Sequence, residues 1–319
     1  MATKNQLKRR QHHVWKSYLR AWATDEKIFC LQDGKIFEPN IRGVAVERDF
    51  YKLQTLSTKE AEFIRLLIGS SPTLATPVHE DFLKMFSIFP LLKDNMPAHM
   101  ASDAEFVALV DQAVTNAEED FHSRIEGGMT AILDAIRRRD ISFYNDAAQS
   151  GKFLHFLSLQ SLRTKGVRER IVERVTALPD VDISKCWPIL RHIFAVNAGA
   201  SLFLERKKRP FFLIENDTSV PFITGDQPVI NLLHSPNRID APTLLAFYYP
   251  VTPWLAVILD EVDERSGYGA GALSIDQVSK LNCEMQAAAF SQVFGHSREV
   301  LTSLRPRENT HDREVIVGG

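Results

Sequence analysis

The sequence predicts an α+β protein in which a helical middle region precedes a mostly antiparallel, β-rich C-terminal part joined by an N-terminal β-hairpin. Three observations predict this class. Helical apolar spacing dominates from about residue 57 to 206, strand-like apolar segments follow from about residue 210, and Asp33-Gly34 divides two apolar segments near the N-terminus. We expect one domain over residues 1–319, with a helical subregion at about 57–206 and a β-rich subregion at about 210–319 plus 27–38.

The N-terminal elements follow from short local patterns. Trp15, Tyr18, Leu19 and Trp22 are spaced i, i+3, i+4 and i+7, which predicts a short amphipathic helix. Asp33-Gly34 then supplies the positive φ angles of a two-residue hairpin turn. We therefore expect a helix followed by a β-hairpin before the helical middle region begins.

Prolines and a capping box mark the later boundaries. Four prolines and the polar stretch 140–150 should interrupt the helical region; the prolines are Pro72, Pro77, Pro90 and Pro97. Ala241–Leu259 is uncharged, but Pro242, Pro250 and Pro253 indicate two strands and not a membrane helix. A C-terminal helix should open at the capping box Ser274–Gln277.

Composition excludes several protein classes. With 45% hydrophobic and 24% charged residues, a net charge of -2 and a pI near 6.6, the chain is neither disordered nor a dedicated nucleic-acid binder. Its three cysteines are far apart and lack metal-ligand spacing, which favours a reducing compartment. No signal peptide is evident, so we expect a cytoplasmic protein without membrane association.

Two carboxamides occupy apolar helical stripes. Gln160 lies in the stripe of the stretch Gly151–Val175, and Asn282 lies at the centre of the stripe that runs from Ile275 to Ala289. A buried amide without partners costs roughly 1–3 kcal/mol. The two amides therefore indicate a polar centre inside the fold.

Three further groups are candidate site residues. His12 is a possible general base or metal ligand if the first helix extends back to it, or else a hydrogen-bonded histidine at a helix start. Asp226 lies in the turn Thr-Gly-Asp-Gln-Pro, where it either faces a cleft or caps its own backbone. Glu118, His122 and Glu126 are spaced four residues apart, which suits a divalent cation or a shared proton; alternatively, Glu126 lies on a solvated helix edge.

Gln160 and Arg163 lie one helical turn apart. The amide would orient a substrate or water while the guanidinium binds phosphate or carboxylate. Alternatively, both side chains, like Asn282, tie helices to the sheet through buried hydrogen bonds.

Several short motifs, in order along nearly the whole chain, carry a family resemblance. They are Gln11-His12-His13-Val14, Tyr18-Leu19-Arg20, Glu47-Arg48-Asp49-Phe50-Tyr51, Ile125-Glu126, Leu159-Gln160 with Arg163-Thr164, Phe222 to Pro228, and Leu281-Asn282. The chain in this respect resembles the mostly bacterial family catalogued as domain of unknown function 4238. Trp15 stands where that family usually has proline, and Gly225 stands where a serine often precedes the aspartate. The resemblance implies a common fold and a shared polar site, but no activity.

Basic clusters give the remaining functional signal. Lys8-Arg9-Arg10 belongs to an N-terminal arm with no acidic residue before Asp25, whereas 137–139 and 206–209 close predicted helices, where cations are favoured by the helix dipole. The sequence contains no Walker loop, dinucleotide-binding glycine pattern, zinc-protease helix or serine-hydrolase elbow. NTPases, dehydrogenases and ordinary serine hydrolases are therefore disfavoured.

The leading hypothesis is a metal-assisted phosphodiesterase, in particular a nuclease of a toxin or phage-defence kind that uses Mg²⁺ or Mn²⁺. His12, Glu126 and Asp226 would serve as base or ligands, and the residues that would hold the substrate are Arg20, Gln160, Arg163 and Asn282. The competing hypothesis is a non-catalytic ligand sensor or interaction module with a buried polar network. The sequence leaves the oligomeric state open.

Overall fold

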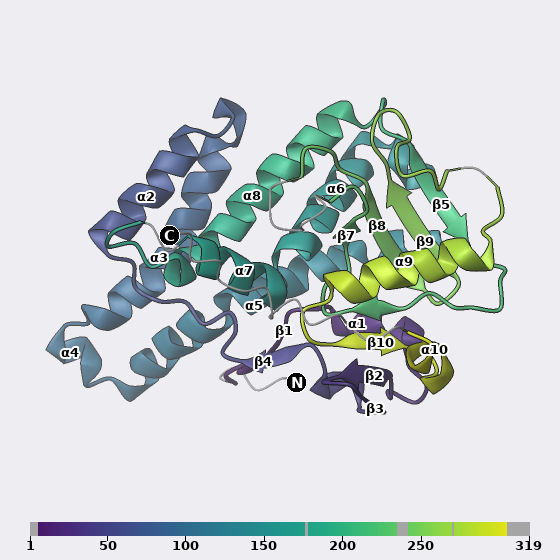
Figure 1. The fold of residues 1–319 in the computed structure, drawn as a ribbon. Helices are drawn as coiled ribbons and strands as arrows, with labels where there is room; N and C mark the ends of the chain where they lie inside the picture. Colours follow the sequence, from purple (N-terminus) through teal and green to yellow (C-terminus); the bar gives the residue numbers. More distant parts are fainter. Residues whose placement is uncertain (1–5, 176–177, 235–241, 270, 305–319) are drawn as a thin grey trace, which may run out of the picture.

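The computed structural model describes residues 6–175, 178–234, 242–269 and 271–304, so part of the basic arm and residues 305–319 lie outside the described chain. The predicted helical middle region is confirmed, and Figure 1 shows its helices crossing one another beside the sheets. These helices are α2 (Thr58–Gly69), α3 (Thr76–Asp94), α4 (Ala98–Ala101), α5 (Ala104–Arg137), α6 (Ala147–Leu162), α7 (Lys165–Arg174) and α8 (Ile183–Glu205).

The strands form antiparallel sheets at the N- and C-terminal parts, which confirms the α+β class. A two-stranded sheet pairs β1 (Arg10–His12) with β4 (Val46–Arg48). The order β3-β2-β10-β6 joins β3 (Lys35–Phe37), β2 (Phe29–Gln32), β10 (Val293–Gly295) and β6 (Thr224–Gly225). The order β5-β9-β8-β7 joins β5 (Phe211–Glu215), β9 (Leu255–Leu259), β8 (Phe247–Thr252) and β7 (Ile230–Asn231).

The local turn and cap predictions are confirmed. Asp33 and Gly34 have φ angles of 50° and 72° between the paired strands β2 and β3. The predicted N-terminal helix is α1 (Lys16–Leu19), which continues as the 3₁₀ turn η1 (Arg20–Trp22). Ser274 and Gln277 form the capping box of α9 (Ile275–Ala288). A last short helix, α10 (Arg298–Thr302), follows β10.

Two boundary predictions in the helical region were wrong. Pro90 lies inside α3 and is buried there, whereas Pro77 does mark a boundary, because it occupies the first turn of α3, where its missing N–H has no acceptor to lose. The stretch 151–175 is not one helix, because α6 ends before Arg163 and α7 begins after Thr164. The polar residues Arg163 and Thr164 form this junction between the two helices.

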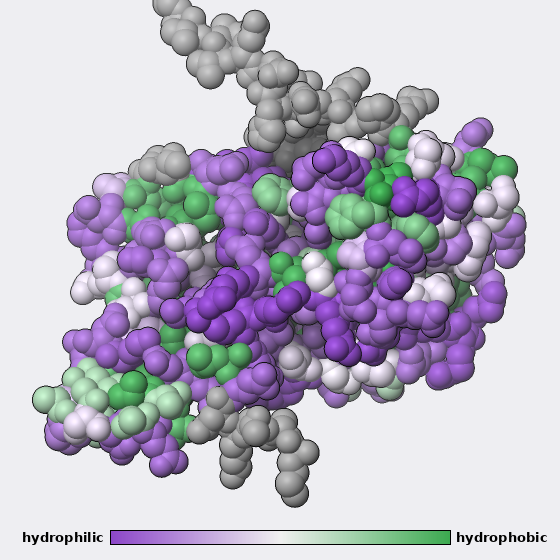
Figure 2. All heavy atoms as spheres, turned by 90° about the horizontal axis from the view of Figure 1, so that it is seen from below, coloured by the Kyte–Doolittle hydropathy of each residue, from purple (hydrophilic) through white to green (hydrophobic). Residues whose placement is uncertain are grey.

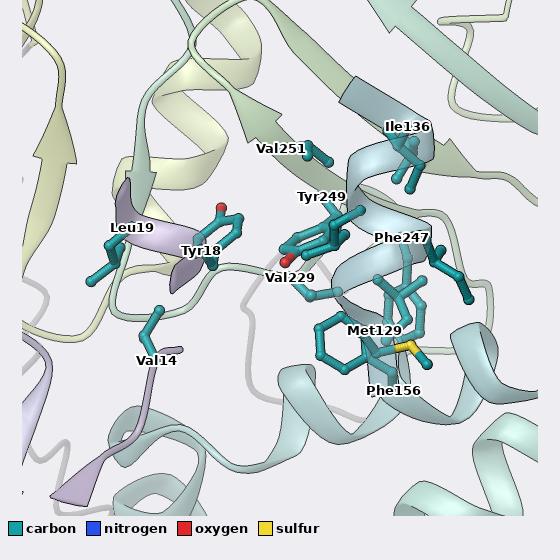
Figure 3. Packing of buried hydrophobic residues seen from close by; sticks show 14 of the residues in the cluster. Val14, Tyr18, Leu19, Met129, Ile136, Phe156, Val229, Phe247, Tyr249 and Val251 are labelled. Carbon is teal, nitrogen blue, oxygen red and sulfur yellow. The ribbon is translucent and has the colours of Figure 1, made fainter. Parts of the chain in front are cut away.

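The largest apolar core joins the helices to the sheets. It contains side chains of α1, α5, α6, β8 and β9. Tyr18 and Tyr249 stack with ring centroids 5.0 Å apart, and Figure 3 shows Met129 and Phe156 beside Tyr249. The Tyr18 hydroxyl donates to the Pro250 carbonyl at 2.8 Å, so this core also fixes α1 on β8.

Helices α6 and α8 pack very closely against each other at Gly199. A Cβ atom on Gly199 would lie 2.9 Å from the His155 Cα, so only glycine allows the two helices to lie this close together. Gly225 has a similar role on the sheet side, because its Cβ would lie 3.0 Å from the Ala289 Cβ. The position where the family often has serine is therefore tightly packed here.

The surface is largely hydrophilic in the view from below, with apolar side chains gathered towards the end of the molecule where α2, α3 and α4 lie (Figure 2). Exposed apolar residues on α3 are Val78, Met85, Ile88 and Leu91. None of the helices in the described part of the chain combines the length and apolarity that crossing a membrane requires.

Candidate metal centre

Arg163 is the hub of a buried polar network. It caps the C-terminal end of α6, it is 1% exposed, and three of its nitrogens donate hydrogen bonds. Nε donates to the Tyr51 hydroxyl at 3.0 Å, Nη1 to Glu126 Oε1 at 2.5 Å and Nη2 to the His12 carbonyl at 2.6 Å. The structure thus brings together His12, Glu126 and Arg163, from β1, α5 and the α6–α7 junction.

Burial changes the ionisation of the acidic groups around this arginine. Burial raises the pKa of Glu126 although the Arg163 guanidinium opposes the shift. Burial likewise raises the pKa of Glu119 to about 7, and the Glu126 charge adds to the effect while Arg163 opposes it. Glu126 thus pairs with the Arg163 guanidinium directly, and Glu119 interacts with the same guanidinium through its charge.

Gln11 fixes the position of the network and was not among the predicted site residues. Its amide donates to the Thr115 carbonyl on α5 at 2.7 Å, and its Oε1 accepts from the Tyr51 backbone N–H at 2.6 Å. Gln11 thereby ties β1, α5 and the segment after β4 together. The only sequence signal for this role was its place in the first family motif.

His12 lies in β1, so the helix does not extend back to it as one interpretation required. The helix begins at Lys16 because Trp15 has an extended backbone, with ψ 119°. Burial, together with the charge of Lys16, lowers the pKa of His12 to about 4, and Nε2 has no hydrogen-bond partner within the described chain. His12 therefore contributes a neutral imidazole with one unused ring nitrogen.

A second buried group lies next to the Arg163 network. Glu118 Oε1 lies 2.5 Å from Arg191 Nε, 3.1 Å from His192 Nε2 and 3.5 Å from His122 Nε2. Glu118 and His122 stand one turn apart on α5, whereas Arg191 and His192 come from α8. The Tyr51 ring connects the two groups, since its centroid lies 4.7 Å from that of His122.

The geometry of Glu118, His122 and His192 suits a metal ion. One ligand atom from each residue lies within 4.8 Å of the others, and all three side chains are at most 1% exposed. Two imidazoles and one carboxylate are a common donor set for zinc and non-haem iron. Burial raises the pKa of Glu118, but Arg191 and the two histidines outweigh it and hold the pKa below its usual range. The carboxylate is thus ready to coordinate a cation.

Several polar atoms of this triad have no partner among the described residues. They are Glu118 Oε2, both ring nitrogens of His122 and His192 Nδ1. Burial is the main cause that lowers the pKa of both histidines, so their rings are neutral and offer lone pairs. Buried polar atoms without partners cost about 1–3 kcal/mol each, so this cluster calls for a ligand or an internal water.

The triad contains His192 in place of Glu126, which the sequence had grouped with Glu118 and His122. Glu126 lies eight residues from Glu118 along α5, roughly 12 Å away, which is too far for both to hold one ion. Glu126 binds Arg163 instead. His192 instead faces Glu118 from α8. No sequence pattern linked residues 118 and 192, since their proximity follows from helix packing.

The Arg163 network contains residues from the motifs that carry the family resemblance, whereas Glu118, His122 and His192 lie outside those motifs. The family model described as "Protein of unknown function (DUF4238)" matches residues 10–299. The chain belongs to this family. No curated protein and no solved structure matches the chain. In this DUF4238 protein, His12, Tyr51, Glu126 and Arg163 connect four of the motifs through hydrogen bonds.

Asp226 and Asn282 lie elsewhere in the DUF4238 fold and bind backbone. The Asp226 carboxylate accepts hydrogen bonds from three successive backbone N–H groups and one hydroxyl; the donors are Phe290 N, Ser291 N, Ser291 Oγ and Gln292 N, at 2.7 to 2.9 Å. Asn282 accepts from Ile223 N at 3.0 Å and donates to the Pro221 carbonyl at 2.9 Å. Both side chains hold loops of the sheet region in place.

The two remaining predicted site residues are Arg20 and Gln160, and neither belongs to the triad. Arg20 is half exposed and donates to Glu26 at 2.8 Å. Gln160 is buried as expected, and its Nε2 has no hydrogen-bond partner within the described chain. The nearby Gln227, which sequence reasoning did not single out, links Thr164 to the Ser161 carbonyl and so joins the Asp226 turn to the α6–α7 junction.

Proposed function

We propose that the protein binds one divalent transition-metal ion through Glu118, His122 and His192. The observation that carries this proposal is the set of unpartnered lone pairs on three buried side chains whose ligand atoms lie within 4.8 Å of one another. Imidazole nitrogens favour zinc or iron, so this donor set suits Zn²⁺ or Fe²⁺ better than Mg²⁺ or Mn²⁺. Arg191 would keep Glu118 oriented through Oε1 and leave Oε2 for the ion.

A structural role without metal is the competing explanation. Arg191 already neutralises Glu118, and the histidines would then pack as neutral rings between Tyr51 and the phenylalanines of α3. Metal analysis separates the two explanations. Protein purified without chelator should retain about one ion per chain, and the ion should raise the thermal midpoint by stabilising the folded state.

Histidine variants make this experiment specific. His122→Gln and His192→Gln should lose the bound ion and the metal-dependent thermal shift, whereas His79→Gln, a change of a buried histidine outside the triad, should retain both. Wild-type protein that holds no Zn²⁺ or Fe²⁺ after gel filtration, or triad variants that bind as well as wild type, would overturn the proposal.

We further propose metal-assisted phosphodiester hydrolysis, and in particular a nuclease of a toxin or phage-defence kind, as the reaction of this centre. Supporting it is the contact through Tyr51 between the triad and the network of His12, Glu126 and Arg163. A bound ion would lower the pKa of a water molecule. His12 and Glu126 would accept protons, and Arg163 would stabilise negative charge. Because the triad is buried, substrate entry requires the surrounding helices to separate.

The original site hypothesis also assigns Asp226 to catalysis and Arg20, Gln160 and Asn282 to substrate binding. The hydrogen bonds of Asp226 and Asn282 to backbone support a positioning role for these two. The proposal accordingly places the chemistry on His12 and Glu126. Nucleic acid is the partner that it requires, and a reducing cytoplasm would keep the three free cysteines unpaired.

Cleavage assays test the reaction separately from metal binding. Metal-loaded protein should hydrolyse DNA, RNA or a small phosphodiester, and His12→Ala and Glu126→Gln should lower the rate by roughly 100-fold with metal still bound. His79→Gln serves again as the control. No hydrolysis by metal-loaded wild type, together with equal effects of wild type and His12→Ala on growth of expressing cells, would refute the nuclease while leaving the metal centre intact.

A further inference from the structure

A separate groove lies on the surface between the N-terminal turn and the second half of α5. It has a volume of about 460 Å³ and is lined by α1 and η1 on one side and by α5 on the other. The lining residues that matter here are Trp15, Ser17, Arg20, Thr130, Leu133 and Arg137. The volume falls within the range of small-molecule sites in proteins, and the lining combines charge, an aromatic ring and hydroxyl groups.

Two guanidinium groups from different elements give the groove its charge. Arg20 donates through Nε to Glu26, and Arg137 donates through Nη1 to Asp134, each at 2.8 Å. These bonds leave further N–H donors on both arginines. Because both ion pairs are partly solvated, they stabilise the protein little and an incoming anion competes with them easily. A phosphate between the two arginines would receive charge-assisted hydrogen bonds from both.

The remaining lining suits the organic part of a phosphorylated ligand. Trp15 is held by an edge contact with Phe156, whose ring centroid lies 6.2 Å away, so its indole is fixed before any ligand binds. Flat aromatic rings of this kind stack on nucleobases with little dependence on sequence. The hydroxyls of Ser17 and Thr130 take part in no hydrogen bond within the described chain and can bind a sugar.

The floor of the groove is part of the packed core. Leu133 belongs to the main apolar core with Tyr18 and Tyr249, and the Tyr18 hydroxyl is satisfied by Thr224 and the Pro250 carbonyl. Figure 3 shows Tyr18 and Tyr249 facing one another in this core. Binding of a ligand in the groove therefore requires little ordering of the protein, so little conformational entropy is lost.

We propose that this groove binds one nucleotide unit, with its phosphate between Arg20 and Arg137 and its base against Trp15. The chemistry is that of a nucleoside monophosphate, either free or at the end of a nucleic-acid chain. The inference does not depend on a metal ion at Glu118 or on phosphodiester hydrolysis.

Calorimetric titration of the full chain with AMP, GMP, CMP and UMP tests the proposal. At least one of these nucleotides should bind, and the matching nucleoside and inorganic phosphate should each bind at least about tenfold more weakly, since each keeps only part of the contacts. A 5′-phosphorylated oligonucleotide that competes with the nucleotide would place a chain end in the groove, and one that does not compete would restrict it to free nucleotides.

Matched variants locate the binding site. Arg137→Gln and Arg20→Gln should each weaken nucleotide binding about tenfold, whereas Arg138→Gln, the same change at the exposed neighbouring residue, should leave it unchanged. Trp15→Leu should weaken nucleotide and nucleoside binding without affecting phosphate. Circular dichroism verifies that the variants fold. Absence of binding by all four nucleotides, or an equal loss in Arg138→Gln, would overturn the inference.

Discussion

The buried polar residues of the helical region and those of the sheet region are satisfied in different ways. On the sheet side, Asp226 accepts hydrogen bonds from three backbone N–H groups and the Ser291 hydroxyl, and Asn282 binds two backbone groups. On the helical side, Glu118, His122 and His192 retain four buried polar atoms without partners. Complete satisfaction is typical of a structural clamp, and incomplete satisfaction is typical of a site that receives a ligand.

Asp226→Asn should give the largest effect and tests the clamp side of this comparison. The amide cannot accept from all four donors at residues 290–292, so the free energy of unfolding should fall by about 3 kcal/mol. Urea denaturation measures the change, and metal content should not alter. Asp217→Asn, on the exposed surface, is the control and should change stability by less than about 0.5 kcal/mol. A fall as small as that of the control would mean that Asp226 is not a clamp.

Acid should weaken the folded protein through His13, which is buried between β1 and α1. Burial, with Arg163, Lys165, His12 and Arg168 nearby, lowers the pKa of His13 from 6.5 to about 3. The unfolded chain therefore binds a proton that the folded chain does not, and stability falls as the pH drops below 6.5 towards 3. Between pH 7 and pH 5 this histidine should cost about 2 kcal/mol of unfolding free energy.

Unfolding at the two pH values, repeated with His13→Asn, measures this contribution. The variant should show a smaller loss between pH 7 and pH 5 than wild type, whereas His99→Asn, at an exposed histidine, should reproduce the wild-type loss. Equal losses in wild type and His13→Asn would show that His13 is not held neutral by burial.

The smallest effect is expected from Gln160→Leu, which compares the two carboxamides directly. Its Nε2 has no partner, so leucine should leave the free energy of unfolding unchanged or raise it by up to about 1 kcal/mol. Asn282→Leu removes two backbone partners and should lower it by about 2 kcal/mol. Thermal and urea unfolding of both variants decide the comparison. A loss at Gln160 as large as at Asn282 would reveal a bound partner for its amide.

Local signals predicted the elements of the fold well. The Asp33-Gly34 turn, the capping box at Ser274 and the change from helices to strands near residue 210 all depend on neighbouring residues, and the structure has them where expected. Pro90 was misjudged because burial outweighs the loss of one helical hydrogen bond. We also propose that residues 1–319 unfold as one domain, because the largest core contains side chains from both regions. Two separate calorimetric transitions would contradict this.

The candidate site was only partly accessible to sequence reasoning. Glu118, His122 and Glu126 were recognised because they recur every four residues along one helix, and Arg163 because it lies one helical turn after Gln160. His192, Arg191, Tyr51 and Gln11 were missed as site residues, since each meets its partners across more than 30 positions of sequence. The pairing of Asp226 with residues 290–292 was hidden for the same reason.

The sequence by itself determined the helical middle region, the β-rich C-terminal part, the Asp33-Gly34 turn, the capping box at Ser274 and the family to which the chain belongs, because these depend on residue types within a few positions of one another. The tertiary structure decided which polar groups meet. Close packing of α8 against the helical layer placed His192 and Arg191 on Glu118, and the junction after α6 aimed Arg163 at β1 and α5. Such contacts depend on how helices pack in three dimensions, and residue spacing carries no record of that.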